Sequence, residues 1–109
     1  MSIQTRLVEY SDAESVLEGM LVWDDEISGP RPGVLVSHAW SGRSDYEEGK
    51  ARRLAELGYV AFALDLYGKG VRGSSVEENS ALMQPFLDDR AMLQRRLLLA
   101  VDTVRQQDE

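Results

Sequence analysis

Residues 37–42, Ser-His-Ala-Trp-Ser-Gly, combine the groups of this sequence that are best suited to chemistry. They follow directly after the apolar residues 34–36, and Gly42 closes the segment. Loops that follow buried strands hold the reactive groups of many α/β enzymes. The imidazole of His38 could transfer a proton, and backbone N–H groups in such a turn could stabilise a developing negative charge. The segment is therefore the first candidate for part of an active site.

His38 and Asp65 also have plainer structural interpretations. His38 is the single histidine of the chain, and no nucleophile and acid stand around it at the spacing that a catalytic base needs. We interpret it as a residue that forms hydrogen bonds within its own turn, with direct chemistry as the alternative. Asp65 ends an apolar run, and aspartates at turns commonly accept hydrogen bonds from backbone N–H groups. This favours a loop-fixing role for Asp65 over a catalytic one.

Residues 68–73, Gly-Lys-Gly-Val-Arg-Gly, match the G-x-G-x-x-G pattern of dinucleotide-binding loops. That function also needs a helix that begins at the last glycine and a second strand that ends in an acidic residue about 20 residues further on. Here Gly73 is followed by two serines and a broken helical pattern, with no strand pattern afterwards. We therefore interpret the segment as a mobile loop that borders the pocket, and expect no nucleotide cofactor.

Composition excludes several classes of function. The chain has 109 residues, of which 43% are hydrophobic, enough for one domain with its own core. Nineteen acidic residues against 12 basic ones give a formal charge of −7, which disfavours binding to nucleic acid or to an anionic membrane. The absence of cysteine excludes disulfides, thiolate metal sites and a cysteine nucleophile within these residues. The first ten residues show neither a signal peptide nor a membrane span, so we expect a soluble, cytoplasmic protein.

The predicted strands indicate an α/β fold. Alternating residues predict an edge strand over residues 3–7 and a second strand over residues 16–23. The polar residues 11–14 between them favour an antiparallel hairpin. Residues 34–36 and 59–64 are continuous apolar runs, which are typical of parallel strands covered on both faces.

Helical signals lie between and after these parallel strands. Ser44 and Glu47 have the spacing of a capping box, and Gly58 supplies a left-handed stop, so a helix should connect the two strands. Its sheet-facing residues should be Ala51, Leu54 and Ala55. A weaker helix is predicted over residues 76–83, interrupted at Pro85.

The last predicted helix is the strongest. It carries an apolar stripe made of Leu93, Leu97, Ala100, Val101 and Val104. Acidic residues 88–89 at its start and Arg105 near its end agree with the helix dipole. The pairs Arg52-Arg53 and Arg95-Arg96 are most simply interpreted as solvated helix faces.

Two segments, GVLVSHAWSG and ARRLAELGYVAFALDLYG, together with the order of the elements, resemble the N-terminal half of the dienelactone hydrolase family, within the α/β-hydrolase fold. The resemblance covers nearly the whole chain. It implies an α/β-hydrolase-like three-layer sandwich, of which residues 1–109 form the N-terminal portion of a single domain. This part holds two antiparallel strands, then a parallel βαβ unit and a long helix, and is truncated before the nucleophile elbow. Members of the family hydrolyse lactones and other carboxylic esters with a Cys-His-Asp triad, sometimes with Ser as nucleophile, and need no metal or organic cofactor.

The resemblance places all three triad residues beyond Glu109, so that this chain would supply only the oxyanion side of the site. It assigns to Trp40 the backbone N–H that would bind the carbonyl oxygen of the substrate. His38, Ala39 and Tyr67 would line the pocket. Dienelactone hydrolases often carry Glu at the position of Ala39, where it interacts with the resting nucleophile. We therefore expect an ester other than dienelactone, or a nucleophile that is held in check differently.

These observations predict a carboxylic ester or lactone hydrolase whose first 109 residues are inactive on their own. The strand that contains Val34 should form an unpaired edge of the sheet, and such edges recruit partners. We expect this chain to associate with the C-terminal half of the same protein or with a second copy through that edge. The alternative is a small, non-catalytic α/β binding or regulatory module, because a fold does not determine a function.

Overall fold

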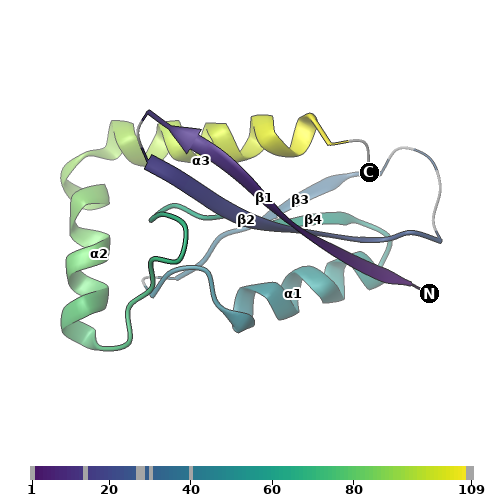
Figure 1. Cartoon of the computed structure of the whole chain (residues 1–109), viewed down its shortest axis with the longest axis horizontal. Helices are drawn as coiled ribbons and strands as arrows, with labels where there is room; N and C mark the ends of the chain where they lie inside the picture. Colours follow the sequence, from purple (N-terminus) through teal and green to yellow (C-terminus); the bar gives the residue numbers. More distant parts are fainter. Residues whose placement is uncertain (1, 14, 27–28, 30, 40, 108–109) are drawn as a thin grey trace.

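The computed structural model describes residues 2–13, 15–26, 29, 31–39 and 41–107. Its strands are β1 (Ile3–Asp12), β2 (Ser15–Asp24), β3 (Gly33–Val36) and β4 (Val60–Ala63), and its helices are α1 (Asp45–Glu56), α2 (Val76–Asp88) and α3 (Arg90–Arg105). The strands form one sheet in the order β1-β2-β4-β3 (Figure 1). Strand β4, which corresponds to the strand predicted over residues 59–64, therefore lies between β2 and β3.

Strands β1 and β2 form the predicted antiparallel hairpin, but the hairpin is longer than the sequence pattern indicated. Ser11 and Asp12 belong to β1, and Asp12 pairs with Ser15. The connection is therefore shorter than the predicted turn over residues 11–14, and Ala13 in it has a positive φ of 55°. Cross-strand pairing extends over ten residues of each strand, because polar residues at the end of a strand can still form the backbone ladder.

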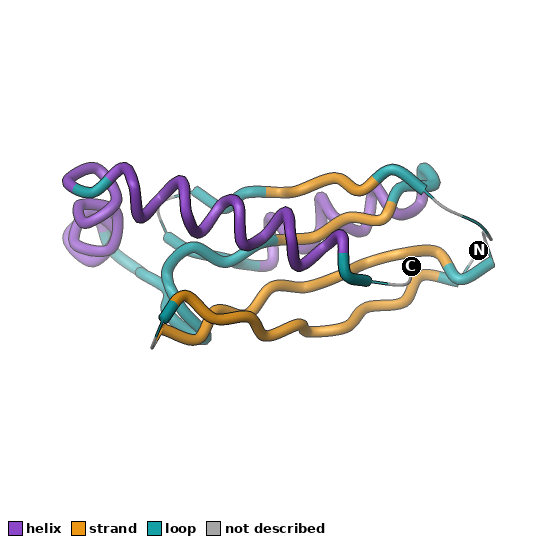
Figure 2. Tube along the Cα trace, turned by 90° about the horizontal axis from the view of Figure 1, so that it is seen from above, coloured by secondary structure: helices purple, strands orange, loops and turns teal. Residues whose placement is uncertain are grey.

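The sheet changes from antiparallel to parallel at β4. Strand β4 pairs antiparallel with β2 and parallel with β3. Helices α1 and α3 cover opposite faces of this sheet, and α2 crosses the end at which β3 and β4 stop (Figures 1 and 2). The arrangement is a three-layer α/β fold, as the resemblance implied.

Alternation along β4 divides the core between the two faces. Phe62 and Leu64 belong to the cluster that packs under α3, together with Leu21 of β2. Ala61 and Ala63 point to the other face, where small residues let α1 approach the sheet closely. Of the three residues predicted to face the sheet from α1, Ala51 and Ala55 are fully buried, and Leu54 is half-buried against this cluster.

Helix α1 begins and ends as its sequence signals predicted. The capping box of Ser44 and Glu47 forms at its start. At its end Gly58 has a φ of 101°, and the N–H of Tyr59 returns to the carbonyl of Leu54 at 3.2 Å. A left-handed glycine is favoured there because a Cβ would strain that conformation.

Helix α2 corrects the prediction of a helix interrupted at Pro85. The helix continues through Pro85 to Asp88, and Phe86 directly after the proline is buried. Proline removes one hydrogen bond from the last part of the helix, and packing of the buried ring compensates for part of that loss. Asp89 then caps α3 by accepting the N–H of Met92 at 3.0 Å.

The arginine pair of α3 also differs from the prediction of a solvated face. Arg96 is only 8% exposed; its Nε donates to Asp12 at 2.8 Å and its Nη1 donates to the carbonyl of Leu66 at 2.6 Å. Arg95 is partly exposed and also binds Asp12 through two hydrogen bonds. The sequence could not indicate this because Asp12 is contributed by the distant hairpin. Arg52 and Arg53 of α1 are exposed, as predicted.

No helix within the described ranges is both long and apolar enough to cross a membrane.

Candidate active site

The turn after β3 lies beside the end of β4, and His38 connects the two. Its Nε2 accepts the backbone N–H of Leu66 at 3.0 Å, and its Nδ1 lies 2.7 Å from the carbonyl of Ala39. Because Leu66 supplies a donor, Nε2 must be unprotonated, so Nδ1 carries the proton and donates to Ala39. His38 is 9% exposed and uses both ring nitrogens on backbone groups. This supports the structural interpretation over a catalytic base.

Both backbone groups of Ala39 are occupied within the protein. Its N–H donates to Oε1 of Glu47 at 3.2 Å. Its carbonyl accepts from His38 and from the N–H of Gly42, the latter at 3.1 Å. Gly42 has a φ of 95°, and a Cβ there would lie 2.8 Å from the carbonyl oxygen of Val71. The turn is therefore a hydrogen-bonded unit that requires glycine at this position.

Glu47 is the residue whose role the sequence did not show in full. It is 4% exposed, and its Oε2 accepts the N–H of Ser44 at 3.1 Å as well as the Ser44 hydroxyl. Burial raises the pKa of Glu47, but the hydrogen bonds from Ser44 and Ala39 outweigh it and hold the pKa below the ordinary value of 4.5. The Ser44-Glu47 spacing revealed the cap; nothing in it indicated the bond to Ala39.

Arg43 attaches the other side of the turn to the rest of the fold. It is 5% exposed, and its guanidinium binds the carbonyl and the carboxylate of Glu18 at 2.9 and 3.0 Å. It also forms a 2.6 Å ion pair with Glu48 of α1. Its own carbonyl accepts a hydrogen bond from Arg72. An arginine after Gly42 gives no sequence signal of these contacts, because every partner outside α1 comes from a distant segment.

Asp65 fixes the loop after β4, as the sequence predicted. Its Oδ1 accepts the N–H groups of Tyr67 and Gly68, both at 3.0 Å, and its Oδ2 accepts the N–H of Glu18 at 2.9 Å. The hydroxyl of Tyr10 donates to the Asp65 carbonyl and accepts its N–H. Burial raises the pKa of Tyr10 to about 12. This carboxylate is therefore occupied by backbone donors and is not available as a catalytic group.

Aromatic rings extend from the turn toward α2. The ring of Tyr67 lies 4.7 Å from that of His38 and 5.4 Å from that of Phe86. The guanidinium of Arg96 stands 5.5 Å from the centre of the Phe86 ring. Burial raises the pKa of the half-buried Tyr67. His38, Ala39 and Tyr67 thus come together at the ends of β3 and β4, and their place in a substrate pocket stays a prediction. Trp40 lies outside the described residues.

The glycine-rich loop is occupied by contacts within the protein. Its Lys69 N–H donates to the carbonyl of Val16 at 2.8 Å, and its Gly73 N–H donates to the carbonyl of Ser41 at 2.9 Å. These amides therefore do not face an open phosphate site. The next helix begins at Val76, not at the last glycine, and no strand follows within the described part of the chain. The arrangement agrees with a loop beside the turn and not with a dinucleotide site.

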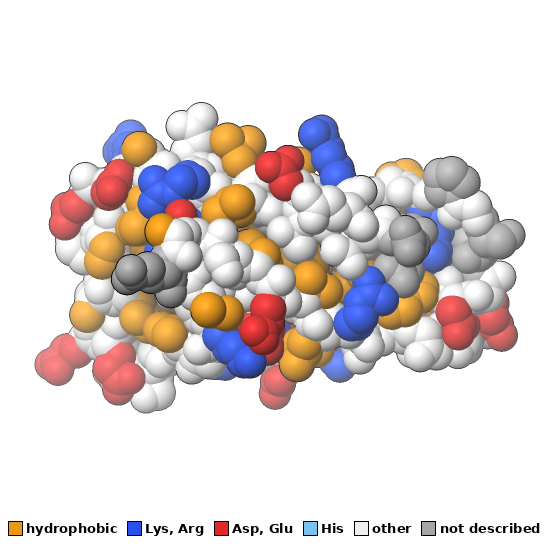
Figure 3. Space-filling model, turned by 45° about the horizontal axis from the view of Figure 1, so that its top comes forward, with side chains coloured by type: hydrophobic (Ala, Val, Ile, Leu, Met, Phe, Trp, Pro, Cys, Tyr) orange, Lys and Arg blue, Asp and Glu red, His pale blue; other side chains and the backbone are white. Residues whose placement is uncertain are grey.

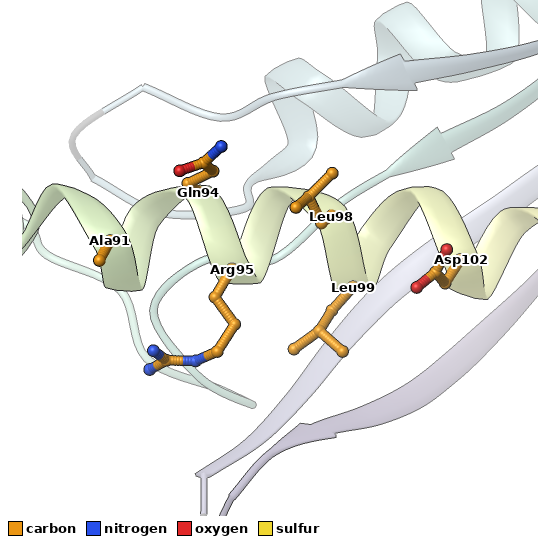
Figure 4. Close-up of a pocket in the computed structure, with 6 residues that line it drawn as sticks. All are labelled: Ala91, Gln94, Arg95, Leu98, Leu99 and Asp102. Atoms are coloured by element: carbon orange, nitrogen blue, oxygen red, sulfur yellow. The ribbon is translucent and has the colours of Figure 1, made fainter.

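The described residues form no metal-ligand cluster, and the depression on α3 is not a convergent ligand site. No group of three or more His, Asp and Glu side chains stands close enough to hold a metal ion there. A shallow depression of about 490 Å³ lies on the outer face of α3 (Figure 4). All of its lining residues belong to that helix: Ala91, Gln94, Arg95, Leu98, Leu99 and Asp102. Since no other element contributes to it, it does not have the convergent polar groups of a ligand site.

The order of the strands and the polar turn after β3 define the N-terminal part of an α/β-hydrolase-like protein. The chain belongs to the dienelactone hydrolase family, whose model matches residues 17–109. A solved structure named m3DLH superposes with a TM-score of 0.94 at 34% identity, covering 98% of this chain and 45% of that one. A dienelactone hydrolase-like promiscuous phosphotriesterase from metagenomic libraries superposes with a TM-score of 0.93 at 36% identity, covering 100% and 45%.

One curated relative carries the word fragment in its name. It is the hydrolase fragment YghX of Escherichia coli strain K12, which is 38% identical over 53% of this chain and 62% of its own length. The chain spans less than two thirds of the length of each of these relatives.

Proposed function

We propose that this chain is the oxyanion-side part of a carboxylic ester or lactone hydrolase that acts by nucleophilic acyl transfer. The nucleophile and its base and acid would lie beyond Glu109. The observation that carries the proposal is the hydrogen-bonded turn after β3, in a chain that belongs to the dienelactone hydrolase family. Family membership favours an enzyme over a non-catalytic binding module.

In this proposal Trp40 contributes its backbone N–H. Attack of a nucleophile on the carbonyl carbon moves a pair of electrons onto the carbonyl oxygen, and preorganised N–H donors stabilise that charge. The N–H of Ala39 cannot serve, because it is already bonded to Glu47. The next peptide, that of Trp40, is therefore the donor that we assign to the oxyanion. A second donor would come from the residue after the nucleophile.

The substrate would meet an apolar and aromatic wall. Tyr67 lies next to His38, and Ala39 offers only a methyl group where dienelactone hydrolases often carry Glu. A wall without a free carboxylate suits neutral esters and lactones better than substrates that need a charged partner. A tetrahedral phosphotriester, the substrate class in the name of one relative, would place an oxygen against the same donor. We place the enzyme in the cytoplasm and assign it no cofactor.

The test is to determine the coding sequence after Glu109 and to assay the complete polypeptide. We expect a strand followed by G-x-C-x-G or G-x-S-x-G within about 20 residues. The complete polypeptide should hydrolyse p-nitrophenyl acetate and a simple lactone, with a p-nitrophenyl phosphotriester as the competing substrate class. Residues 1–109 alone should show no turnover above buffer. A stop codon directly after Glu109, or turnover by the 109 residues themselves, would contradict the proposal.

A further inference from the structure

We propose that Glu47 is a positioning residue of the hydrolytic site: its carboxylate holds the Ala39 peptide in place, so that the following N–H is presented to the substrate. The inference rests on the proposed function and goes beyond it. It names a residue in the first turn of α1, outside the turn after β3, that no triad or oxyanion motif includes.

The contacts of Glu47 use both oxygens of a buried carboxylate. Oε1 accepts from Ala39 at 3.2 Å, and Oε2 accepts from the N–H and the hydroxyl of Ser44. Ala39 lies at one end of the turn and Ser44 directly after the other end, so one side chain joins the two ends of the segment. With 4% exposure, water cannot replace these bonds at low cost.

An ionised carboxylate is the group that suits these donors. Ala39 and Ser44 both present N–H donors, and a carboxylate accepts hydrogen bonds on both oxygens. Glu47 also lies in the first turn of α1, where the helix dipole favours negative charge. A glutamine could accept one of the two N–H groups, but its own amide group would then face the other. Charge, and not only shape, therefore determines whether the turn is held at both ends.

Arg43 holds the same turn independently, through different partners. Its side chain binds Glu18 and Glu48, and no bond joins it to Glu47. Loss of the Glu47 contacts should therefore loosen the Ala39 end of the turn without detaching the whole segment. This predicts a change in the rate of the chemical step more than in the overall fold.

The experiment uses the complete polypeptide encoded by the reading frame that contains these residues, as the wild type, Glu47→Gln and the control Glu56→Gln. Glu56 is exposed and ends the same helix. In the wild type, the amide proton shifts of Ala39 and Ser44 should titrate together, with a midpoint below 4.5. This joint titration should disappear in Glu47→Gln and persist in Glu56→Gln. For p-nitrophenyl acetate, kcat of Glu47→Gln should fall about 10- to 100-fold with KM changed less than about twofold.

The two readouts separate the possible failures. If Ala39 and Ser44 do not titrate together in the wild type, the inference is overturned without any variant, even if Glu47→Gln fails to fold. An unchanged kcat in Glu47→Gln overturns it as well. If the wild type hydrolyses no ester while the joint titration is present, the proposed function has failed, and the catalytic role of Glu47 fails with it. A joint titration together with a selective loss of kcat supports both.

Discussion

At the residue scale, buried polar side chains hold the turn and the segments beside it by bonding to backbone groups. His38, Arg43, Glu47 and Asp65 are each nearly buried, and each binds at least one peptide N–H or carbonyl group. A turn cannot satisfy its own backbone as a helix or sheet does, so these groups need partners from elsewhere. The position of the proposed donor is therefore set by side chains such as Glu47, which bonds to the backbone before and after it.

Replacement of Arg43 by Met should destabilise the protein severely. The substitution removes the guanidinium from the largely buried carboxylates of Glu18 and Glu48, of which, among the described residues, only Glu18 keeps a second ion pair, at 3.7 Å to Lys69; breaking a buried ion pair costs up to about 3–5 kcal/mol. Urea unfolding of Arg43→Met should show this loss. The exposed Arg53→Met is the matched control, with an expected change within about 0.5 kcal/mol. Equal stability of the two variants would refute the importance of the buried contacts.

At the element scale, the tip of the β1–β2 hairpin is joined to α3 by an ionic contact. Asp12 accepts hydrogen bonds from Arg95 at 2.6 and 3.0 Å and from Arg96 at 2.8 Å. Hydrogen bonds from these two guanidinium groups lower the pKa of Asp12 from 3.8 to about 2. Through Arg96 the contact continues to the carbonyl of Leu66, next to the proposed site.

This contact predicts a loss of stability in acid. Folding lowers the pKa of Asp12, so its carboxyl group releases its proton more readily in the native state than in the unfolded chain. The stabilisation that ionised Asp12 contributes is therefore present above pH 3.8 and is lost as the pH falls toward 2. The free energy of unfolding of the wild type should therefore fall more steeply across this range than that of Asp12→Asn. The comparison is made by urea unfolding at several pH values. Parallel pH profiles would show that Asp12 contributes nothing to this dependence.

Replacement of Pro85 in α2 by alanine should stabilise the protein. The proline ring removes a hydrogen bond inside the helix, which costs about 3 kcal/mol of stability relative to alanine. Proline also restricts the unfolded chain, and this lower conformational entropy offsets up to about 1 kcal/mol of that cost. Because Pro85 is exposed, its replacement leaves no cavity. Pro85→Ala should therefore raise the free energy of unfolding by about 2 kcal/mol, measured by urea unfolding. A destabilised variant would mean that the proline shapes the packing of α2.

At the scale of the whole molecule, the fold is flat and leaves β3 at one edge. The radius of gyration is 14.1 Å, against roughly 13 Å for a compact domain of this length. The molecule measures 42 × 26 × 18 Å. On the face that carries α3, apolar side chains lie among charged and other polar ones (Figure 3). We propose that the β3 edge, not this helical face, is the association surface.

Hydrogen exchange of the Leu35 amide tests whether the β3 edge is paired. The carbonyls of Pro32 and Val36 accept N–H groups from β4, so the backbone groups of Leu35, which alternate with them, point away from β4. We expect the 109 residues to self-associate in sedimentation, or to bind the C-terminal half of the protein. Either event should slow hydrogen exchange of the Leu35 amide. The Val36 amide, directed at β4, serves as the internal control. A stable monomer with a protected Leu35 amide would contradict this proposal.

The order of the elements was predictable because its signals are local. Alternation and apolar runs identified the strands, and the capping box and Gly58 identified the limits of α1, since each signal acts within a few residues. The helix past Pro85 was not predictable in this way, because burial of Phe86 acts against the local effect of the proline.

The sequence by itself therefore determined the class of fold and the place of the candidate turn. Only the tertiary structure decided how that turn is held. Arg43 meets Glu18 at a separation of 25 residues, and Arg96 meets Asp12 at a separation of 84. The physical reason is that a buried charge takes its partner from whichever chain segment the packed core brings beside it, and sequence spacing does not encode that neighbour.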